Sequence, residues 1–198
     1  AVRLTEHTDT DGVVGPARRE AGRAGALVFV MPQPALPPRH FALTFQLLMG
    51  RGGGADGFSV SYGDIPSGAV GELGAGNGLR VCFRTHSFER VEVWYGAKLL
   101  VNAAAASGTL RADAYVEVRV AFGVDGLSVS HAGDVYADAL RIDEWAPERG
   151  WRFALGARSG ALRDDHFVSA MLLEGGAAFA AESVDVEVSR NGQDFSTS

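Results

Sequence analysis

Apolar side chains in this chain recur at every second residue, over short runs that turn-forming residues separate. Alternation with a period of two places apolar side chains on one face of an extended strand, whereas a helix needs a spacing of three or four. In the clearest run, Phe41, Leu43, Phe45 and Leu47 alternate with smaller or polar residues. The same pattern predicts strands with one buried face at 58–62, 79–84, 91–95, 116–122, 127–130 and 184–188.

The residues between these runs favour tight hairpins. Glycine-containing turns occur at 95–98, 124–126 and 132–134. Only 103–113 and 139–149 could hold a short helix, and Gly108 and Pro147 limit both. Many short alternating strands at hairpin spacing predict antiparallel sheets packed face to face. We therefore expect an all-β protein that forms a β-sandwich.

The length of 198 residues suits one domain of this kind. We find no internal repeat and no convincing boundary, so we treat 1–198 as a single domain. The last part, 176–198, could be a strand or a linker toward a neighbouring module. The chain begins with Ala1, which we interpret as the start of a processed or excised piece, and an earlier signal peptide stays open.

Composition excludes several classes of partner. The formal net charge is −6, which argues against nucleic acid, because phosphates need a concentrated basic surface. No apolar run approaches the length of a membrane span, so we expect no membrane insertion. Cys82 is the only cysteine, which rules out an internal disulfide and a structural zinc site made of thiols.

Catalytic patterns fail on their spacing. A retaining glucanase on a sandwich needs carboxylates at even offsets along one strand, and Glu182 is out of phase with Asp185 and Glu187. The five histidines show no HExxH spacing, and no Gly-x-Ser-x-Gly sequence occurs. We expect a protein that is not an enzyme and that needs no cofactor.

Metal-ligand patterns are equally weak. The stretch 9–20 superficially matches an EF-hand, but Val14 stands where the loop needs glycine and Pro16 lies inside it. Calcium bound weakly by the turn at 9–12 remains open. Asp164, Asp165 and His166 could ligate a metal, although an acidic surface turn is the interpretation we favour.

The glycine-rich stretch GRGGGADG, at 50–57, places Asp56 between two predicted strands. Outward-facing residues of other strands are further candidates. Arg80 and Arg84 share a sheet face and could bind an anion or a glycan, although pairing with acids on adjacent strands is favoured. Trp94 alternates away from the core and is the best of three tryptophans for stacking on a sugar, although tryptophans in sandwiches mostly pack.

The order of segments resembles the legume-type (L-type) lectins and their concanavalin A-like relatives, from Val2 to Glu174. FALTFQL at 41–47 resembles a family strand, and GADGFSVSY at 54–62 is similar to the lectin segment ADGLAFFL. The segments VRLT, RAGALVFVMPQP, GNGLRVCFRT and WRFALGARSGALRDDHFVSAMLL follow the family in the same order. The resemblance implies a concanavalin A-like jelly-roll sandwich. It is closest to modules embedded in large surface or adhesive proteins.

The resemblance also implies a sugar-binding rim. Asp56 matches the family aspartate that accepts sugar hydroxyls, and in the family the peptide bond between Ala55 and Asp56 is cis. The matching loops contribute Gly74, Gly76, Asn77, Gly160, Ala161, Leu162 and Arg163. The alternative for Asp56 is a carboxylate that caps N–H groups of its own turn.

The metal site of the family does not carry over. Its VEFDT segment supplies a glutamate and an aspartate to manganese and calcium, and Cys82 and Arg84 stand at those positions. An arginine repels a cation and cannot ligate it. We therefore expect recognition of a glycan or glycoprotein without a metal, outside the cell or at its surface. The alternatives are a structural or adhesive module that contacts neighbouring proteins and binds no sugar, and a degenerate glycosidase.

Overall fold

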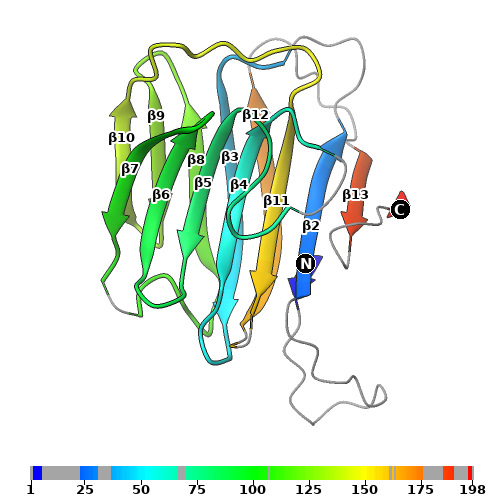
Figure 1. Cartoon of the computed structure of the whole chain (residues 1–198), viewed down its shortest axis with the longest axis vertical. Helices are drawn as coiled ribbons and strands as arrows, with labels where there is room; N and C mark the ends of the chain where they lie inside the picture. The colour runs from blue at the N-terminus through cyan, green and yellow to red at the C-terminus, as the bar shows by residue number, and fades with distance from the viewer. Residues whose placement is uncertain are drawn as a thin grey trace.

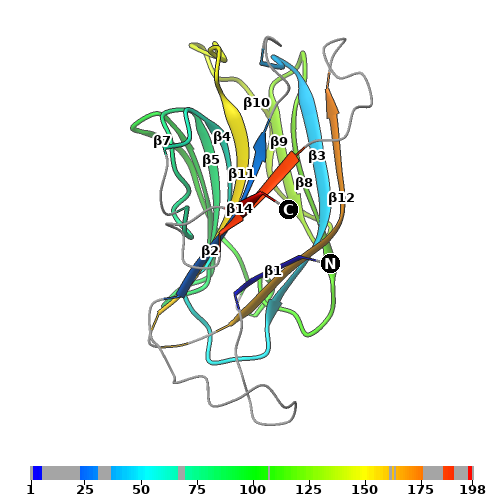
Figure 2. The same ribbon diagram turned by 90° about the vertical axis from the view of Figure 1, so that its right-hand side faces the viewer.

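Two antiparallel sheets pack face to face in the computed structural model, as the side view in Figure 2 shows. The structure describes residues 2–5, 23–30, 37–66, 70–106, 108–160, 162, 164–175, 185–189 and 196–197. The expected all-β concanavalin A-like sandwich is confirmed. Both sheets are assembled from strands that are far apart in the chain (Figure 1).

The six-stranded sheet contains, in spatial order, β1 (Val2–Thr5), β12 (Asp165–Gly175), β3 (Phe41–Gly50), β8 (Val116–Phe122), β9 (Leu127–His131) and β10 (Asp134–Leu140). The eight-stranded sheet contains β14 (Ser196–Thr197), β13 (Asp185–Ser189), β2 (Arg23–Val30), β11 (Arg152–Ser159), β4 (Gly57–Gly63), β5 (Leu79–Arg84), β6 (Arg90–Tyr95) and β7 (Lys98–Ala104). The strand expected near 184–188 thus pairs with β2 of this same sheet.

Alternation correctly predicts which side chains fill the space between the sheets. Leu43, Phe45 and Leu47 of β3 are 0% exposed and belong to one core with Phe58 and Val60 of β4. Burial of each side chain of this size contributes about 2 kcal/mol to the free energy of folding. The hydrophobic effect therefore fixes the pairing of the two faces.

The two segments that could have held a short helix form none in the described residues. Neither 103–113, apart from Ser107, nor 139–149 holds a helix in the described chain. Residues up to Ala104 belong to β7, which continues the hairpin from β6 through the pair Val93↔Val101. Residues up to Leu140 belong to β10, the edge strand beside β9. None of the described residues forms a helix long and apolar enough to span a bilayer.

An aromatic cluster closes one end of the sandwich. The rings of Tyr62 and Phe153 stack with centroids 4.1 Å apart, and Phe122 and Trp145 stack at 4.0 Å. The Tyr62 hydroxyl donates to the Pro38 carbonyl at 2.8 Å. Strands β3 and β11 begin at this end, and β4, β6 and β8 finish there. We call it the aromatic end.

The described part of the connection from β4 to β5, residues 64–66 and 70–78, lies over the outer face of the eight-stranded sheet, in front of β4 in Figure 1. The Ser59 hydroxyl donates to the Gly71 carbonyl at 2.6 Å, and the Ala75 N–H donates to the Ser61 hydroxyl at 3.1 Å. Both serines are 0% exposed. The prediction of a single buried face at 58–62 is therefore wrong, because a distant part of the chain covers the second face.

Candidate functional site

The end of the sandwich opposite the aromatic end carries the loops that hold the predicted site. Strand β3 ends there at Gly50 and β4 begins at Gly57, while β5 and β11 finish there. We call this end the rim. It consists of the loops 51–56, 85–89, 105–115 and 160–164, without Ser107, Ala161 and Arg163, which lie outside the described residues.

Asp56 is fixed through its backbone. Its N–H donates to the Arg158 carbonyl at 2.9 Å, and its own carbonyl accepts from the Thr85 N–H at 3.1 Å. The peptide bond between Ala55 and Asp56 is cis, as in the family that the sequence resembles. Ala55, the residue before Asp56 in this rim loop, is only 1% exposed and is therefore buried.

The Asp56 carboxylate points toward the loop that follows β11. A Cβ atom added to Gly160 would lie 2.9 Å from both carboxylate oxygens of Asp56. Within the described chain, its ion-pair partner is Arg158, whose Nε lies 3.5 Å from Asp56 Oδ2. In the described part of the chain no N–H donates a hydrogen bond to this carboxylate, so the turn-cap alternative has no support there.

Leu162 completes the contact between the two loops. A Cβ at Gly53 would lie 3.3 Å from Leu162 Cδ2, and Leu162 is 48% exposed. The structure thus brings together Asp56, Gly160 and Leu162 from the predicted set. Ala161 and Arg163 lie outside the described residues, so their part of the prediction has no structural counterpart.

The glycine loop lies elsewhere on the sheet. A Cβ at Gly74 would meet the Ser61 hydroxyl at 2.6 Å, and one at Gly76 would meet the Asp64 carbonyl at 2.6 Å. Ser61 is four residues beyond Gly57, which is roughly 13 Å along an extended strand. Gly74, Gly76 and the exposed Asn77 therefore lie toward the aromatic end, away from the Asp56 carboxylate.

A different residue of the same connection reaches toward the rim. Glu72 is 6% exposed, and its Oε1 lies 3.7 Å from Nη1 of Arg158. Since Arg158 also faces Asp56, this arginine links the covering segment to the predicted sugar-binding aspartate. No pattern in the sequence indicates Glu72, because its contact with Arg158 depends on how the described segment 70–78 lies over the sheet.

Arg111 joins three rim loops and was not predicted. Its Nε donates to Asp164 Oδ2 at 2.8 Å, and its Nη2 donates to Asp164 Oδ1 at 2.7 Å and to the Gly52 carbonyl at 2.6 Å. Asp164 is 0% exposed and His166 is 0% exposed. The interpretation of 164–166 as an acidic surface turn is therefore wrong: the segment is buried, and an ion pair with the 105–115 loop stabilises it.

The residues at the family's metal-ligand positions do not fit a cation. Cys82 is 0% exposed, and burial raises the pKa of its thiol to about 12. Arg84 is positively charged and its Nη1 lies 3.6 Å from Glu92 Oε2. The described residues include no group of three or more His, Cys, Asp or Glu side chains that could hold a metal ion.

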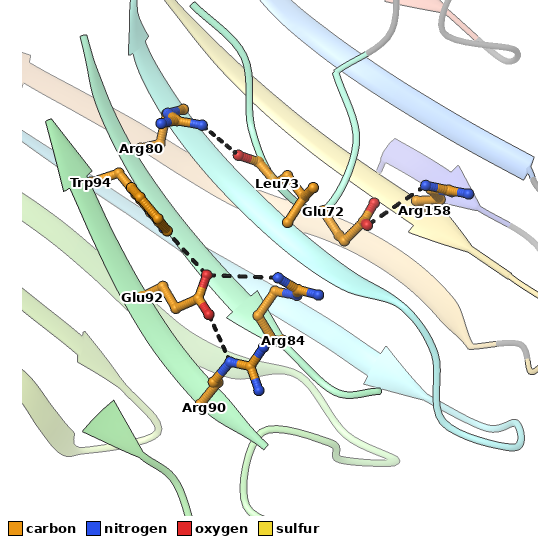
Figure 3. A network of polar contacts seen from close by, with 8 residues as sticks. All are labelled: Glu72, Leu73, Arg80, Arg84, Arg90, Glu92, Trp94 and Arg158. Atoms are coloured by element: carbon orange, nitrogen blue, oxygen red, sulfur yellow. Dashed lines mark hydrogen bonds and ion pairs between the residues drawn. The ribbon is translucent and has the colours of Figure 1, made fainter. Parts of the chain in front are cut away.

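A polar network occupies the outer face of the eight-stranded sheet (Figure 3). Glu92 accepts a hydrogen bond from Arg90 Nε at 2.6 Å and one from Trp94 Nε1 at 3.2 Å. Burial alone would raise the pKa of Glu92, but these hydrogen bonds and the charges of Arg84 and Arg90 hold it below the ordinary value. The expected pairing of Arg84 with an acid on an adjacent strand is thus confirmed.

Arg80 and the tryptophans have other partners. Arg80 Nη2 donates to the Gly96 carbonyl at 2.8 Å, and its guanidinium lies 5.4 Å from the centre of the Trp94 ring. For Arg80 the pairing with an acid is therefore wrong, because backbone carbonyls and a ring face receive it. Trp145 and Trp151 pack in the aromatic end, 6.1 Å apart, in agreement with the packing interpretation.

Solved structures of lectin domains share this fold. The VIP36 exoplasmic/lumenal domain in its Ca2+-bound form superimposes with a TM-score of 0.60 and 16% identity, over 99% of this chain and 83% of that one. Its Ca2+/Man3GlcNAc-bound form gives 0.58 and 15%, over 90% and 84%. The carbohydrate recognition domain of Emp46p, in a potassium-bound form, gives 0.59 and 13%, over 77% and 79%.

Sequence comparison adds nothing to this structural likeness. No family model matches the chain, and no curated protein matches it. The chain therefore has the fold of L-type lectin carbohydrate-recognition domains, although its sequence identity to the VIP36, Emp46p and Emp47p domains is only 12–16%.

Proposed function

We propose that the chain is a non-enzymatic carbohydrate-recognition module in which the Asp56 carboxylate accepts hydrogen bonds from sugar hydroxyls. The observation that carries the proposal is the setting of this side chain. Its backbone is held by hydrogen bonds to Arg158 and Thr85, and its carboxylate is 19% exposed. Hydrogen bonds from hydroxyls to a carboxylate are among the strong ones, so a preorganised carboxylate suits a sugar.

The similar structures support the same class of ligand. VIP36 has been solved with Man3GlcNAc, and the Emp47p structure is a carbohydrate recognition domain. Fold likeness alone does not carry function, so the proposal rests on Asp56 together with the neighbouring Gly160 and Leu162. Outside the cell or at its surface, such a module would meet glycans or glycoproteins.

We further propose that binding needs no metal. Cys82 and Arg84 stand at the family's ligand positions, and the Arg111 guanidinium holds three rim loops through protein groups alone. A rim organised in this way keeps its shape without calcium. The expected binding is therefore the same with calcium and with a chelator.

The second candidate function is contact with neighbouring protein modules, without any sugar. The observation in its favour is the exposure of apolar side chains on the edge strands β7 and β10, where Leu99 is 39% exposed and Val135 is 64% exposed. Open sheet edges are able to pair with another chain.

A glycan array with calcium or with a chelator separates these functions. We expect the protein to retain at least one glycan under both conditions. Asp56→Ala should reduce the signal to background without lowering the midpoint of thermal unfolding. Asp125→Ala, an exposed aspartate in the turn after β8 at the aromatic end, is the matched control and should bind normally.

Each other outcome contradicts a stated part of the proposal. Retention of no glycan under either condition would leave the protein-contact function. Full binding by Asp56→Ala would move the site away from the rim. Binding that disappears with the chelator would refute metal independence, and hydrolysis of any β-glucan would show that the protein is an enzyme.

A further inference from the structure

Three arginines lie in one row across the outer face of the eight-stranded sheet, at the rim. Arg158 of β11 pairs with Gly57 of β4, Gly57 pairs with Arg84 of β5, and Arg84 pairs with Arg90 of β6. Their chain neighbours Ala157, Phe83 and Val91 belong to the core. Because side chains alternate along a strand, the three arginines share the opposite face. We call them the arginine row.

Like charges in neighbouring strands destabilise a sheet unless acids compensate them. Among the residues that the structure describes, the acids paired with the row are Glu92, Glu72 and Asp56, and their contacts are uneven. Glu92 gives its shortest contact, 2.6 Å, to Arg90, while Arg84 lies 3.6 Å from it. Arg158 lies 3.5 Å from Asp56 and 3.7 Å from Glu72. Arg84 and Arg158 thus have only long ion pairs.

Hydrogen-bond donors in the row remain unused. Among the described residues, the buried Nε of Arg84 has no hydrogen-bond partner. Both contacts of Arg158 are longer than a charge-assisted hydrogen bond, which spans roughly 2.8 Å between nitrogen and oxygen. The Arg158 side chain is 50% exposed and that of Arg84 is 22% exposed. The Nε of Arg84 is buried and cannot reach a ligand, so a further acceptor from solvent would meet the terminal nitrogens of Arg84 and the half-exposed guanidinium of Arg158.

Gly57, which has no side chain, lies between these two arginines in the row. Neighbouring strands lie about 4.8 Å apart, so the backbones of Arg84 and Arg158 are separated by about 10 Å, with a residue that has no side chain between them. Arg84 and Arg158 are seen on either side of β4 in Figure 3. Asp56, whose carboxylate we propose to accept hydrogen bonds from sugar hydroxyls, directly precedes Gly57 in the chain.

We propose that Arg84 and Arg158 bind an anionic substituent, a carboxylate or a sulfate, of a glycan whose hydroxyls contact Asp56. This inference rests on the proposed sugar binding and specifies its ligand as an acidic glycan. Each guanidinium group can donate several hydrogen bonds to the oxygens of either anion. Asp56 and Glu72 on the Arg158 side repel the anion, so Arg84 makes the closer contact.

Matched sugars test the inference. Methyl glucuronide and glucose 6-sulfate carry the two kinds of anion, and methyl glucoside is the neutral control. We expect each acidic sugar to bind about tenfold more tightly than the neutral one, and this preference to fall as salt is raised. NMR signals of the arginine Nε–H groups should move for Arg84 and Arg158, and the lower dissociation constant identifies carboxylate or sulfate as the preferred anion.

Single variants assign the effect to the row. Arg84→Gln should remove most of the preference while binding of methyl glucoside stays the same. Arg158→Gln should also remove most of the preference, measured as the ratio of the affinities for acidic and neutral sugar, because Arg158 contacts Asp56 and its loss can change the affinity for both. If Arg84→Gln does not fold, Arg84→Lys takes its place in the test. Lysine keeps the charge but loses the paired donors of the guanidinium group, so the preference for acidic sugars should fall. Arg119→Gln changes an exposed arginine on the other sheet and should keep the preference.

The results distinguish failure of this inference from failure of the proposed function. Equal affinity for acidic and neutral sugars, unchanged in the arginine variants, would overturn the inference while sugar binding stands. Shifts of the Arg84 and Arg158 signals with acidic sugars that persist in Asp56→Ala would support the anion site and contradict the role of Asp56. No shift and no binding with any of the three sugars would overturn both.

Discussion

At the scale of single residues, the contact between Gly160 and Asp56 determines access to the rim carboxylate. Alanine at 160 would place its Cβ 2.9 Å from both Asp56 oxygens, which is too close, so the carboxylate must turn away. The movable end of one side chain gives way at little cost in stability. We expect Gly160→Ala to weaken glycan binding at least tenfold while the thermal midpoint stays within about 2 °C of the native protein.

Gly123→Ala is the control for that substitution. A Cβ at Gly123 meets no atom within 4 Å, and Gly123 lies in the turn after β8. Glycan titration and thermal unfolding of the two variants check the prediction. Undiminished binding by Gly160→Ala would show that the Asp56 carboxylate does not contact the sugar.

The buried thiol of Cys82 gives a second prediction at this scale. Burial raises its pKa to about 12, so almost no thiolate exists near pH 8, and reagents have no path to the sulfur. We expect iodoacetamide to leave the native protein unmodified and to label it fully in denaturant, as mass spectrometry would show. Rapid labelling of the native protein would mean that this part of the sheet opens locally.

At the scale of elements, Arg111 holds the rim loops together. Substitution by methionine leaves the fully buried Asp164 carboxylate without its two short hydrogen bonds from Arg111 and removes the bond to Gly52. Loss of one partner from a buried pair should lower the free energy of unfolding by about 3 kcal/mol. Urea denaturation measures this, and hydrogen exchange should become faster in 51–54.

Lysine at the same position separates charge from geometry. Arg111→Lys keeps the charge but cannot make the paired bonds to both carboxylate oxygens, so we expect it to recover less than half of the lost stability. Arg119→Met controls for the removal of an exposed arginine. A stability loss below about 1 kcal/mol for Arg111→Met would mean that the loops are held by other contacts.

Strands were predictable from the sequence where one face is buried and the other is polar, as in β3 and β8. β7 was not predicted because it is an edge strand. Its side chains are exposed or half-buried on both faces, so apolar and polar residues do not alternate along it. β11 was identified only through the family resemblance, since most of its residues are buried on both faces and give no period. At the site, Asp56 and Gly160 were predicted through the resemblance, whereas Arg111 and Glu72 depend on contacts between loops distant in the chain.

At the scale of the whole molecule, two buried histidines make stability depend on pH. Burial lowers the pKa of His131 to about 4 and that of His166 to about 3. The unfolded chain, with ordinary values near 6.5, binds more protons in between, so stability is complete above about pH 6.5 and falls as the pH drops toward 4. Each histidine should contribute a loss of about 2 kcal/mol between pH 7 and pH 5.

Urea denaturation at pH 7 and pH 5 checks the prediction. His131→Phe, beside the Phe83 ring at 5.6 Å, should remove about half of the decline, whereas His40→Gln, at an exposed position, should leave it intact. This window lies above the carboxyl range, so the lowered pKa of Glu92 adds its own loss only at more acidic pH. A flat profile between pH 7 and pH 5 would mean that both imidazoles reach solvent.

The aromatic end has a consequence for how such a molecule can diversify. Much of the aromatic packing of the protein lies at this end, away from Asp56, in contacts such as Tyr62 with Phe153 and Phe122 with Trp145. Substitutions in loops far from this packing change the free energy of unfolding almost independently of it. Side chains at 51–56 and 160–163 could therefore be substituted, in evolution or in a directed-evolution library, to bind new ligands while the packing of the aromatic end keeps the chain folded.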